Sequence, residues 1–303
     1  MFTGLMPAMV TPFDERGELD LRATGEVVER SIGAGVSGIV ILGSTGEFPQ
    51  LDGDERRRFA EEVAELVAGR VPLVVGVGTS GTREAVALAR HAEEAGADGV
   101  ISVSPFYWTV GEEALFKHFA TVSESVGIPM LVYNFPLLTG IDLSPALVAR
   151  LATECPNITG IKDTVTEHIH TVNVLREVKP RRPGFSVLSG FEDQILPNLL
   201  AGGDGSICGL SNVAPELFVG LVEAAQRGDL HEAAERHRRV LRLMALGSLS
   251  DPVVGAVKVA MAKLGVPISP AVRGPALPAP SEAYGEIEAV LEGAGLLPVA
   301  EGA

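Results

Sequence analysis

The stretch that decides the fold is PLVVGVGTSGTREAVALARHAEEAGADGVISV, residues 72–103. It begins and ends with apolar runs, Pro72–Val77 and Gly99–Val103, which are too short for helices, rich in Val and Ile, and not alternating with polar residues. Such runs are typical of strands buried on both faces of a parallel sheet. Between them, Thr82–Ala95 has the apolar periodicity of an amphipathic helix, and Gly96 predicts its end. The stretch therefore predicts a strand–helix–strand unit.

The same unit repeats along the chain. Six further apolar runs lie at roughly even spacing, with amphipathic stretches between them: Leu5–Val10, Gly38–Leu42, Pro129–Tyr133, Ile158–Lys162, Phe185–Ser189 and Gly205–Cys208. Eight such strand–helix units predict an α/β fold, a closed (β/α)8 or TIM barrel. An open, doubly wound sheet is the alternative. The regular spacing, and the absence of a G-x-G-x-x-G turn after the first strand, favour the barrel.

The pattern changes after about Gly228. Three stretches have helical periodicity with no strand between them: Asp229–Leu246, Pro252–Leu264 and Ser281–Leu296. The segment Pro267–Pro280 contains five prolines, which predicts an irregular strap. We therefore expect two domains, a barrel over residues 1–228 and a C-terminal helical appendage over residues 229–303.

Composition limits the function classes. The 303 residues include 24 Lys and Arg against 39 Asp and Glu, a net charge of −15, so we expect neither nucleic acid nor anionic lipid as a partner. No apolar run approaches the roughly 18 residues of a membrane span. Met1–Gly4 lacks the charged and apolar segments of a secretory signal. Two cysteines, Cys155 and Cys208, are too few for a disulfide framework. We therefore expect a cytoplasmic protein without a membrane partner.

Lys162 is the sharpest candidate catalytic residue. It ends a predicted buried strand, so its side chain should lie in the barrel mouth. Burying an ammonium group costs several kcal/mol unless the group is paired or loses its proton, so a lysine there suits an imine-forming nucleophile. The alternative is a structural ion pair with Asp163 or a neighbouring acid. The other four lysines lie in helical or charged stretches, where we expect solvated amines: Lys117, Lys179, Lys258 and Lys263.

Two further segments lie at predicted strand ends. Tyr133 ends the strand before that of Lys162, where a phenol can carry protons to and from an imine adduct. Packing with a hydrogen-bonded hydroxyl is the alternative role. The loop Gly43–Glu47 offers successive N–H groups and two hydroxyls, which can hold a carboxylate without a cation, although the same sequence also suits an ordinary turn.

We expect no metal site. His168 and His170 are two residues apart on a predicted helix and point to different sides, and no H-E-x-x-H or C-x-x-C motif occurs. The run Arg56–Arg58 predicts a solvated helix face.

Four motifs, in order and spacing, resemble the pyruvate-dependent class I aldolases, the superfamily that contains dihydrodipicolinate synthase and N-acetylneuraminate lyase: Ala8–Phe13, Gly43–Glu47, Tyr133–Pro136 and Gly160–Thr164. The resemblance spans roughly the whole chain. It implies a (β/α)8 barrel, a Schiff base on Lys162 and a proton relay through Tyr133. It also implies that the chemistry needs no metal and no organic cofactor.

The resemblance also implies binding roles. It places the substrate carboxylate at Ser44 and Thr45, with Thr45 also in the proton relay. Gly190 and Ile207 match positions near the bound keto acid. Family members are commonly homotetramers in which an aromatic residue of a neighbouring subunit completes the relay, and Tyr107 matches that residue. The implied partners are a small keto acid, pyruvate or a 2-keto-3-deoxy sugar acid, and further copies of the chain.

Leu138 discriminates between members of the family. Dihydrodipicolinate synthases carry an arginine at this position, two residues after the proline of the tyrosine motif, where it binds the carboxylate of aspartate semialdehyde. Losing such a bidentate partner should cost ~100-fold in affinity. The stretches Tyr133–Gly140, Gly43–Gln50 and Tyr107–Trp108 are more similar to bacterial 2-keto-3-deoxygluconate aldolases. We therefore expect reversible cleavage of a 2-keto-3-deoxy sugar acid to pyruvate and an aldehyde.

Three alternatives remain open at this point. The chain is also compatible with a 4-hydroxy-tetrahydrodipicolinate synthase, which condenses pyruvate with aspartate semialdehyde. A keto-deoxy sugar acid dehydratase would use the same imine but expel a hydroxyl group. A keto-acid sensor would keep the barrel without turnover, but the intact pair of Lys162 and Tyr133 argues against it.

Overall fold

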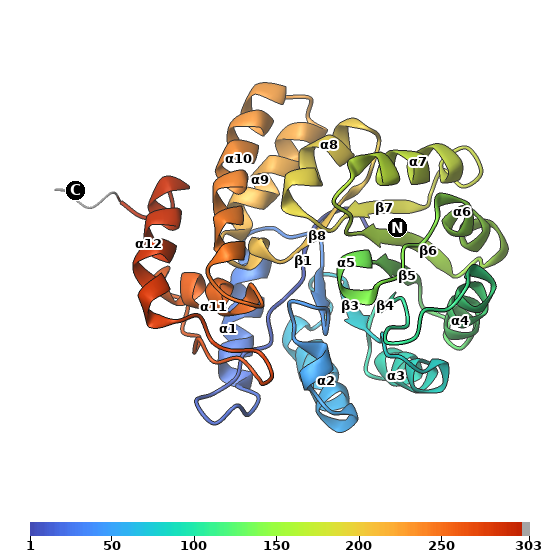
Figure 1. Ribbon diagram of the computed structural model, residues 1–303, viewed down its shortest axis with the longest axis horizontal. Helices are drawn as coiled ribbons and strands as arrows, with labels where there is room; N and C mark the ends of the chain where they lie inside the picture. The colour runs from blue at the N-terminus through green and yellow to red at the C-terminus, as the bar shows by residue number, and fades with distance from the viewer. Residues whose placement is uncertain (299–303) are drawn as a thin grey trace.

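Eight short parallel strands form the centre of the computed structural model, which describes residues 1–298 (Figure 1). They coincide with the predicted apolar runs to within a few residues: β1 Gly4–Pro7, β2 Ile39–Ile41, β3 Leu73–Gly76, β4 Gly99–Val103, β5 Met130–Asn134, β6 Ile158–Asp163, β7 Ser186–Ser189 and β8 Gly205–Cys208. Every strand residue except Thr159 is buried. Burial on both faces explains why the runs do not alternate with polar residues.

Hydrogen bonds close the strands into a barrel. The order is β1-β8-β7-β6-β5-β4-β3-β2, with all neighbours parallel. β1 and β2, at the two ends of this order, meet where Ala8 and Val40 form a parallel bridge and the Met9 N–H donates to the Val40 carbonyl at 2.8 Å. The predicted TIM barrel is confirmed, because an open doubly wound sheet would leave two unpaired edges.

Helices cover the outside of the barrel (Figure 1). They are α1 Leu21–Gly33, α2 Gly53–Val67, α3 Thr82–Glu94, α4 Glu112–Glu124, α6 Pro145–Glu154, α7 His168–Val178, α8 Ile195–Leu200 and α9 Pro215–Gln226. A single turn, α5 Pro136–Thr139, lies in the connection between β5 and β6. In the described part of the chain, no helix has both the length and the hydropathy that a bilayer-spanning segment requires.

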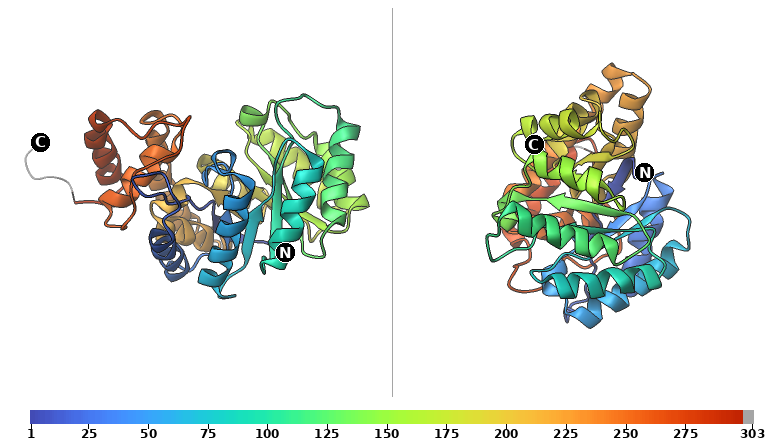
Figure 2. Two further views of the ribbon diagram at one scale, coloured as in Figure 1. Left: turned by 90° about the horizontal axis from the view of Figure 1, so that it is seen from below. Right: turned by 90° about the vertical axis from the view of Figure 1, so that its right-hand side faces the viewer.

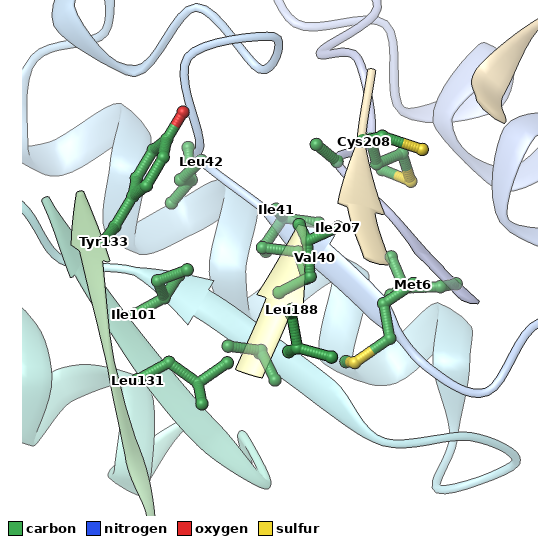
Figure 3. Close-up of a cluster of buried hydrophobic side chains, with 14 of the residues drawn as sticks. Met6, Val40, Ile41, Leu42, Ile101, Leu131, Tyr133, Leu188, Ile207 and Cys208 are labelled. Carbon is green, nitrogen blue, oxygen red and sulfur yellow. The ribbon is translucent and has the colours of Figure 1, made fainter. Parts of the chain in front are cut away.

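The inside of the barrel is a packed apolar core rather than a pore. Side chains that point inward from six strands fill it: Met6, Val40, Ile101, Leu131, Leu188 and Ile207 (Figure 3). Filling a barrel of eight strands takes layers of such side chains, so ligands are excluded from its middle. Polar groups can therefore meet a substrate only at an end of the barrel.

Three helices follow the barrel: α10 Leu230–Leu243, α11 Val254–Lys263 and α12 Tyr284–Gly293. Figure 2 shows this appendage at one end of the molecule, in orange and red. The tighter turns Met244–Ser248 and Ser281–Ala283 continue α10 and precede α12, which is why periodicity predicted longer helices. The strap 267–280 contains neither helix nor strand. Because α10 contacts α8 and α9 of the barrel, the division into two domains at residue 228 stays a prediction.

Two cations predicted to be solvated are buried, so those expectations were wrong. Lys258 on α11 is fully buried and forms an ion pair with Glu47. Arg56 on α2 is 5% exposed and donates to the carbonyl groups of Gly76 and Gly78, and burial lowers its pKa to about 10. In both cases the partners come from distant segments, which periodicity along one helix cannot reveal.

Candidate active site

The candidate active site is a cavity of about 420 Å³ at the carboxyl ends of the strands. Its walls come from the loops that follow β2, β5, β6, β7 and β8, and from the segment 244–257 of the appendage. Ser44, Thr45, Tyr133 and Lys162 all line it. In a closed parallel barrel these strand ends converge on one mouth. The structure therefore brings together four of the predicted site residues.

Lys162 lies on β6 with 5% of the residue exposed. Its Nζ lies 4.2 Å from the centroid of the Tyr133 ring, and within residues 1–298 it takes part in no ion pair. Asp163 points to the other side of the strand, because successive side chains alternate. The Asp163 carboxylate accepts hydrogen bonds from Asn134 and His170, both at 2.9 Å. The structural ion pair between Lys162 and Asp163 is therefore excluded.

Tyr133 lies directly opposite Lys162 in the register of β5 and β6. Its ring stacks on Phe135 with the centroids 5.7 Å apart, and its hydroxyl lies 3.5 Å from the Ser44 Oγ. Figure 3 shows the ring above Ile101 of the barrel core, with the hydroxyl directed away from it. The packed ring therefore fixes a hydroxyl group in the mouth, next to the lysine.

The loop Gly43–Glu47 carries Ser44 and Thr45 to the opposite wall of the cavity. It is held from the side of β1, where the Thr11 hydroxyl donates to the Gly46 carbonyl at 2.6 Å. Gly209, after β8, lies so close that a Cβ there would come within 2.8 Å of the Thr45 Oγ1. Neighbouring strand ends thus restrain the two hydroxyl residues.

Gly190 and Ile207 lie in different environments. Gly190 lines the cavity, and a Cβ at this position would fall 1.7 Å from the Thr164 Oγ1, so only glycine leaves room for Thr164. Ile207 is fully buried below the cavity with Leu188 and Val40, and its side chain is not part of the lining (Figure 3). The structure brings Gly190 to the site and keeps the Ile207 side chain in the barrel core.

Tyr107 does not reach the cavity of its own chain. It follows β4, is 92% exposed and has a positive φ of 82°, and the adjacent Trp108 is exposed as well. A non-glycine residue in this backbone region is uncommon and strained. The action of Tyr107 in a neighbouring subunit stays a prediction.

Glu192 is a site residue that the sequence-based predictions missed. It lies in the turn Glu192–Gln194 after β7, lines the cavity and is buried. Burial raises the pKa of its carboxyl group, although the Leu210 N–H donates to its Oε1 at 2.9 Å. An acid three residues after a buried strand is the signal that could have identified it.

The appendage supplies a second group of site residues that was not predicted. Met244, Asp251, Val253, Val254 and Val257 line the cavity on the side away from the barrel. This wall is mostly apolar, and Asp251 is its one ionisable member. No local pattern marks these positions, because their approach to the barrel mouth depends on the path of the whole appendage.

A polar network lies behind Lys162 and Tyr133. His170 on α7 contacts the Asp163 Oδ2 and the Leu143 carbonyl, each at 2.9 Å, and Asp142 at 3.4 Å. Burial alone would lower the pKa of His170, but the two carboxylates and the carbonyl outweigh it and raise the pKa to about 9. Asn134 donates to both Asp142 and Asp163 at 2.9 Å. The network ties the β5–β6 connection to the strand ends that carry the tyrosine and the lysine.

The two histidines point to different partners. His168 Nδ1 lies 2.9 Å from the Gln194 Oε1, whereas His170 faces Asp163. Among residues 1–298 no group of three or more His, Cys, Asp or Glu side chains is arranged to hold a metal ion. A chemistry without metal stays a prediction.

Cys208 is free and buried, and burial raises the pKa of its thiol to about 12.

Comparison with known proteins places this site in a family. Residues 1–294 match the model of the dihydrodipicolinate synthetase family. The Escherichia coli protein named "Probable 2-dehydro-3-deoxy-D-pentonate aldolase YjhH" is 41% identical over 298 residues, which are 98% of this chain and 99% of that protein. The 4-hydroxy-tetrahydrodipicolinate synthase of Thermotoga neapolitana is 37% identical over 98% of this chain and all of its own length.

A solved structure is similar over nearly the whole chain. YagE of Escherichia coli, a prophage protein of the dihydrodipicolinic acid synthase family crystallised with pyruvate, superposes with a TM-score of 0.96 at 40% identity. The match covers 98% of this chain and 100% of YagE.

Proposed function

Because the chain belongs to the dihydrodipicolinate synthetase family, as its four motifs predicted, we propose that it is a Schiff-base-forming class I aldolase. Its reaction is the reversible cleavage of a 2-keto-3-deoxy sugar acid to pyruvate and an aldehyde. One observation carries the proposal: the Lys162 amine lies in the cavity 4.2 Å from the Tyr133 ring, and it forms no ion pair with any acid among residues 1–298. The name of the relative YjhH, where dehydro denotes the same keto group, supports this class of substrate.

The proposed reaction uses protein side chains only. The uncharged amine of Lys162 attacks the C2 ketone, and loss of water leaves a protonated imine that accepts electrons. Tyr133 gives its proton to the hydroxyl group that leaves as water, and the resulting phenolate takes the proton of the C4 hydroxyl as the C3–C4 bond breaks and the aldehyde leaves. The enamine that remains is reprotonated at C3, and hydrolysis of the imine releases pyruvate and the free lysine. Each step balances without a metal or an organic cofactor.

Ser44 and Thr45 bind the carboxylate of the keto acid. Their loop offers N–H groups and hydroxyls on the wall that faces Tyr133, and the 3.5 Å approach of the Ser44 Oγ to the Tyr133 hydroxyl provides a route for protons. Backbone and hydroxyl donors of this kind hold a carboxylate without a cation. Gly190, whose lack of a side chain leaves room for Thr164, keeps the floor beside the imine open.

The charges of the cavity favour a sugar acid over aspartate semialdehyde. Lys162 is the one cation among the lining residues in the described part of the chain, and it is used for the imine. Leu138, 64% exposed, lines the mouth where an arginine would be needed for a second carboxylate. An uncharged polyol instead needs hydrogen-bonding groups, which Glu192 and Thr164 offer. These contacts support the aldolase rather than the synthase.

Tyr107 is assigned to the site of a neighbouring subunit. Its exposed side chain and positive φ support a role outside its own chain, in a homotetramer in which each site receives one tyrosine from a neighbour. The two free and buried cysteines support a cytoplasmic location.

The direct test is reduction with borohydride in the presence of pyruvate, followed by mass mapping of peptides. We expect a stable adduct on Lys162, no adduct in Lys162→Ala, and an unchanged adduct in Lys117→Ala, whose amine is exposed on α4. Turnover of 2-keto-3-deoxy sugar acids is then followed by the release of pyruvate and aldehyde.

Two results would contradict the proposal. An adduct that persists in Lys162→Ala would refute the assignment of the nucleophile. Dehydration without pyruvate release, or efficient condensation of pyruvate with aspartate semialdehyde, would refute the assignment of the reaction and the importance given to Leu138.

A further inference from the structure

A fully buried ion pair joins the appendage to the loop after β2. The Lys258 Nζ lies 2.6 Å from the Glu47 Oε1, and the two side chains are 0% and 3% exposed. The same ammonium group donates to the Ala271 carbonyl at 2.7 Å. Neither residue lies where it could react with the substrate. Desolvating two charges often cancels the gain from their attraction, so stability alone is a weak reason for such a pair.

Glu47 ends the loop that carries Ser44 and Thr45. Its backbone has a positive φ of 53°, an uncommon conformation for glutamate that surrounding contacts must hold in place. Both carboxylate oxygens are engaged, Oε1 by Lys258 and Oε2 by the Arg273 N–H at 2.9 Å. Both contacts come from the appendage, so α11 and the strap hold the Glu47 side chain, in addition to the contact of Thr11 with the Gly46 carbonyl on the barrel side.

Arg273 holds the strap 267–280 against the barrel close to Glu47. Its guanidinium group donates to both carboxylate oxygens of Glu55 at 2.6 Å and to the Gly17 carbonyl at 2.7 Å. Both cations lie against the Phe13 ring, whose centroid is 4.5 Å from the Lys258 Nζ and 4.6 Å from the Arg273 Cζ. The cluster thus has a rigid apolar centre. A loop held this way has little freedom to shift.

The appendage also borders the substrate cavity directly. Val257, the residue before Lys258, lines the cavity together with Val254 one turn earlier on α11. The same helix therefore forms one cavity wall and holds the end of the loop that forms another. A displacement of α11 would move both walls together.

We propose that Glu47 and Lys258 are a positioning pair for substrate binding. They fix the loop Gly43–Glu47 to α11, so that Ser44 and Thr45 present their donors to the carboxylate of the keto acid. This inference rests on the proposed function, and it identifies the ion pair that aligns the carboxylate-binding loop. Misplacing a binding group by about 1 Å can cost up to roughly 100-fold.

The test compares Lys258→Met, Glu47→Gln and the double variant in the full-length protein. The double variant removes both charges, so no buried charge is left unpaired and folding is retained. Borohydride trapping at graded pyruvate concentrations gives the half-saturating concentration, steady-state kinetics give KM and kcat, and thermal unfolding gives Tm. We expect the half-saturating pyruvate concentration and KM to rise roughly 10- to 100-fold in all three variants, with a much smaller change in kcat.

Lys179→Met is the matched control. Lys179 forms a partly buried ion pair with Asp204, just before β8, at the end of the barrel opposite the cavity. The Lys179→Met variant should have a lower Tm than the wild type and an unchanged half-saturating pyruvate concentration.

The outcomes separate this inference from the proposed function. Failure of the wild type to form an adduct on Lys162 would refute the proposed function. Normal trapping in the wild type, with wild-type pyruvate dependence in the double variant, would overturn the positioning role, and so would a loss of kcat without a change in KM. A double variant that unfolds while Lys179→Met stays folded would also overturn it, because the pair would then be structural support only.

Discussion

Lys162 and Asp163 are neighbours in the chain with opposite surroundings. Alternation along β6 turns the lysine into the cavity and the aspartate toward α7, and the aspartate carboxylate accepts hydrogen bonds from Asn134, His170 and Thr171. The acid nearest in sequence is therefore removed from the amine. An amine engaged in a salt bridge is not available as a nucleophile, and the geometry at Lys162 avoids such a pair with Asp163.

Replacing Tyr133 by Phe tests the proton relay at the scale of one residue. The ring would keep its stacking on Phe135 and lose only the hydroxyl next to Ser44. We expect kcat for retro-aldol cleavage to fall roughly 100- to 10,000-fold, while borohydride still traps pyruvate on Lys162. Tyr284→Phe, on the distant helix α12, is the control and should keep full activity. Wild-type kcat in Tyr133→Phe would exclude the relay.

The segment 135–144, which joins β5 to α6, contains the single turn α5 and is otherwise irregular. It nevertheless supplies Phe135, Leu137 and Leu138 to the cavity. His170 on α7 holds it through Asp142 and the Leu143 carbonyl. Helix α7 thus holds the segment between β5 and α6 in place through the buried, protonated imidazole of His170.

This arrangement makes stability depend on pH. The pKa of His170 is about 9 in the folded protein, above its unfolded value near 6.5, so its contribution is fully present below about pH 6.5 and is lost as the pH rises through 9. We expect the unfolding free energy of the wild type to fall, relative to His170→Gln, by about 3 kcal/mol between pH 6 and 10. Urea unfolding at a series of pH values measures the difference.

His118→Gln is the control for this prediction. Burial between α3 and α4 lowers the pKa of His118 to about 4, so the group is already uncharged over this range. Its variant should follow the pH dependence of the wild type. Parallel curves for the wild type and His170→Gln would contradict the assigned charge on His170.

At the scale of the whole molecule, the barrel and the appendage share one site. The segment 244–257 closes the cavity on its outer side, and Lys258 holds a loop of the barrel. Tyr107 shows the opposite situation, because its chain leaves it exposed, away from the cavity. We expect the complete catalytic unit to be larger than one chain.

Mixing two inactive variants tests the role of a neighbouring subunit. Lys162→Ala lacks the nucleophile, and Tyr107→Phe lacks the donated hydroxyl. If Tyr107 acts across an interface, hybrids contain sites with both groups, and co-refolded mixtures should be more active than the sum of the two parents. Aldolase assays and size-exclusion chromatography measure activity and assembly. If the mixture is no more active than the sum of the two parent variants, Tyr107 does not act in the site of a neighbouring subunit.

The sequence alone was enough to predict the barrel and the meeting of Lys162 with Tyr133. Buried parallel strands are recognisable from local composition, and the ends of parallel strands in a closed barrel must converge on one mouth. Two residues at adjacent strand ends therefore become neighbours whatever the details of packing. The same reasoning brought Ser44 and Thr45 to that mouth.

Only the tertiary structure decided which charges are buried and what closes the cavity. Lys258 and Glu47 are 211 residues apart, so nothing in the sequence of α11 identifies Glu47 as the partner of its lysine. Glu192 acquires its raised pKa from burial by surrounding loops, and the wall from Met244 to Val257 forms because the appendage packs against the barrel. Burial and desolvation depend on all the atoms that surround a group in space, whereas sequence patterns record only its neighbours along the chain.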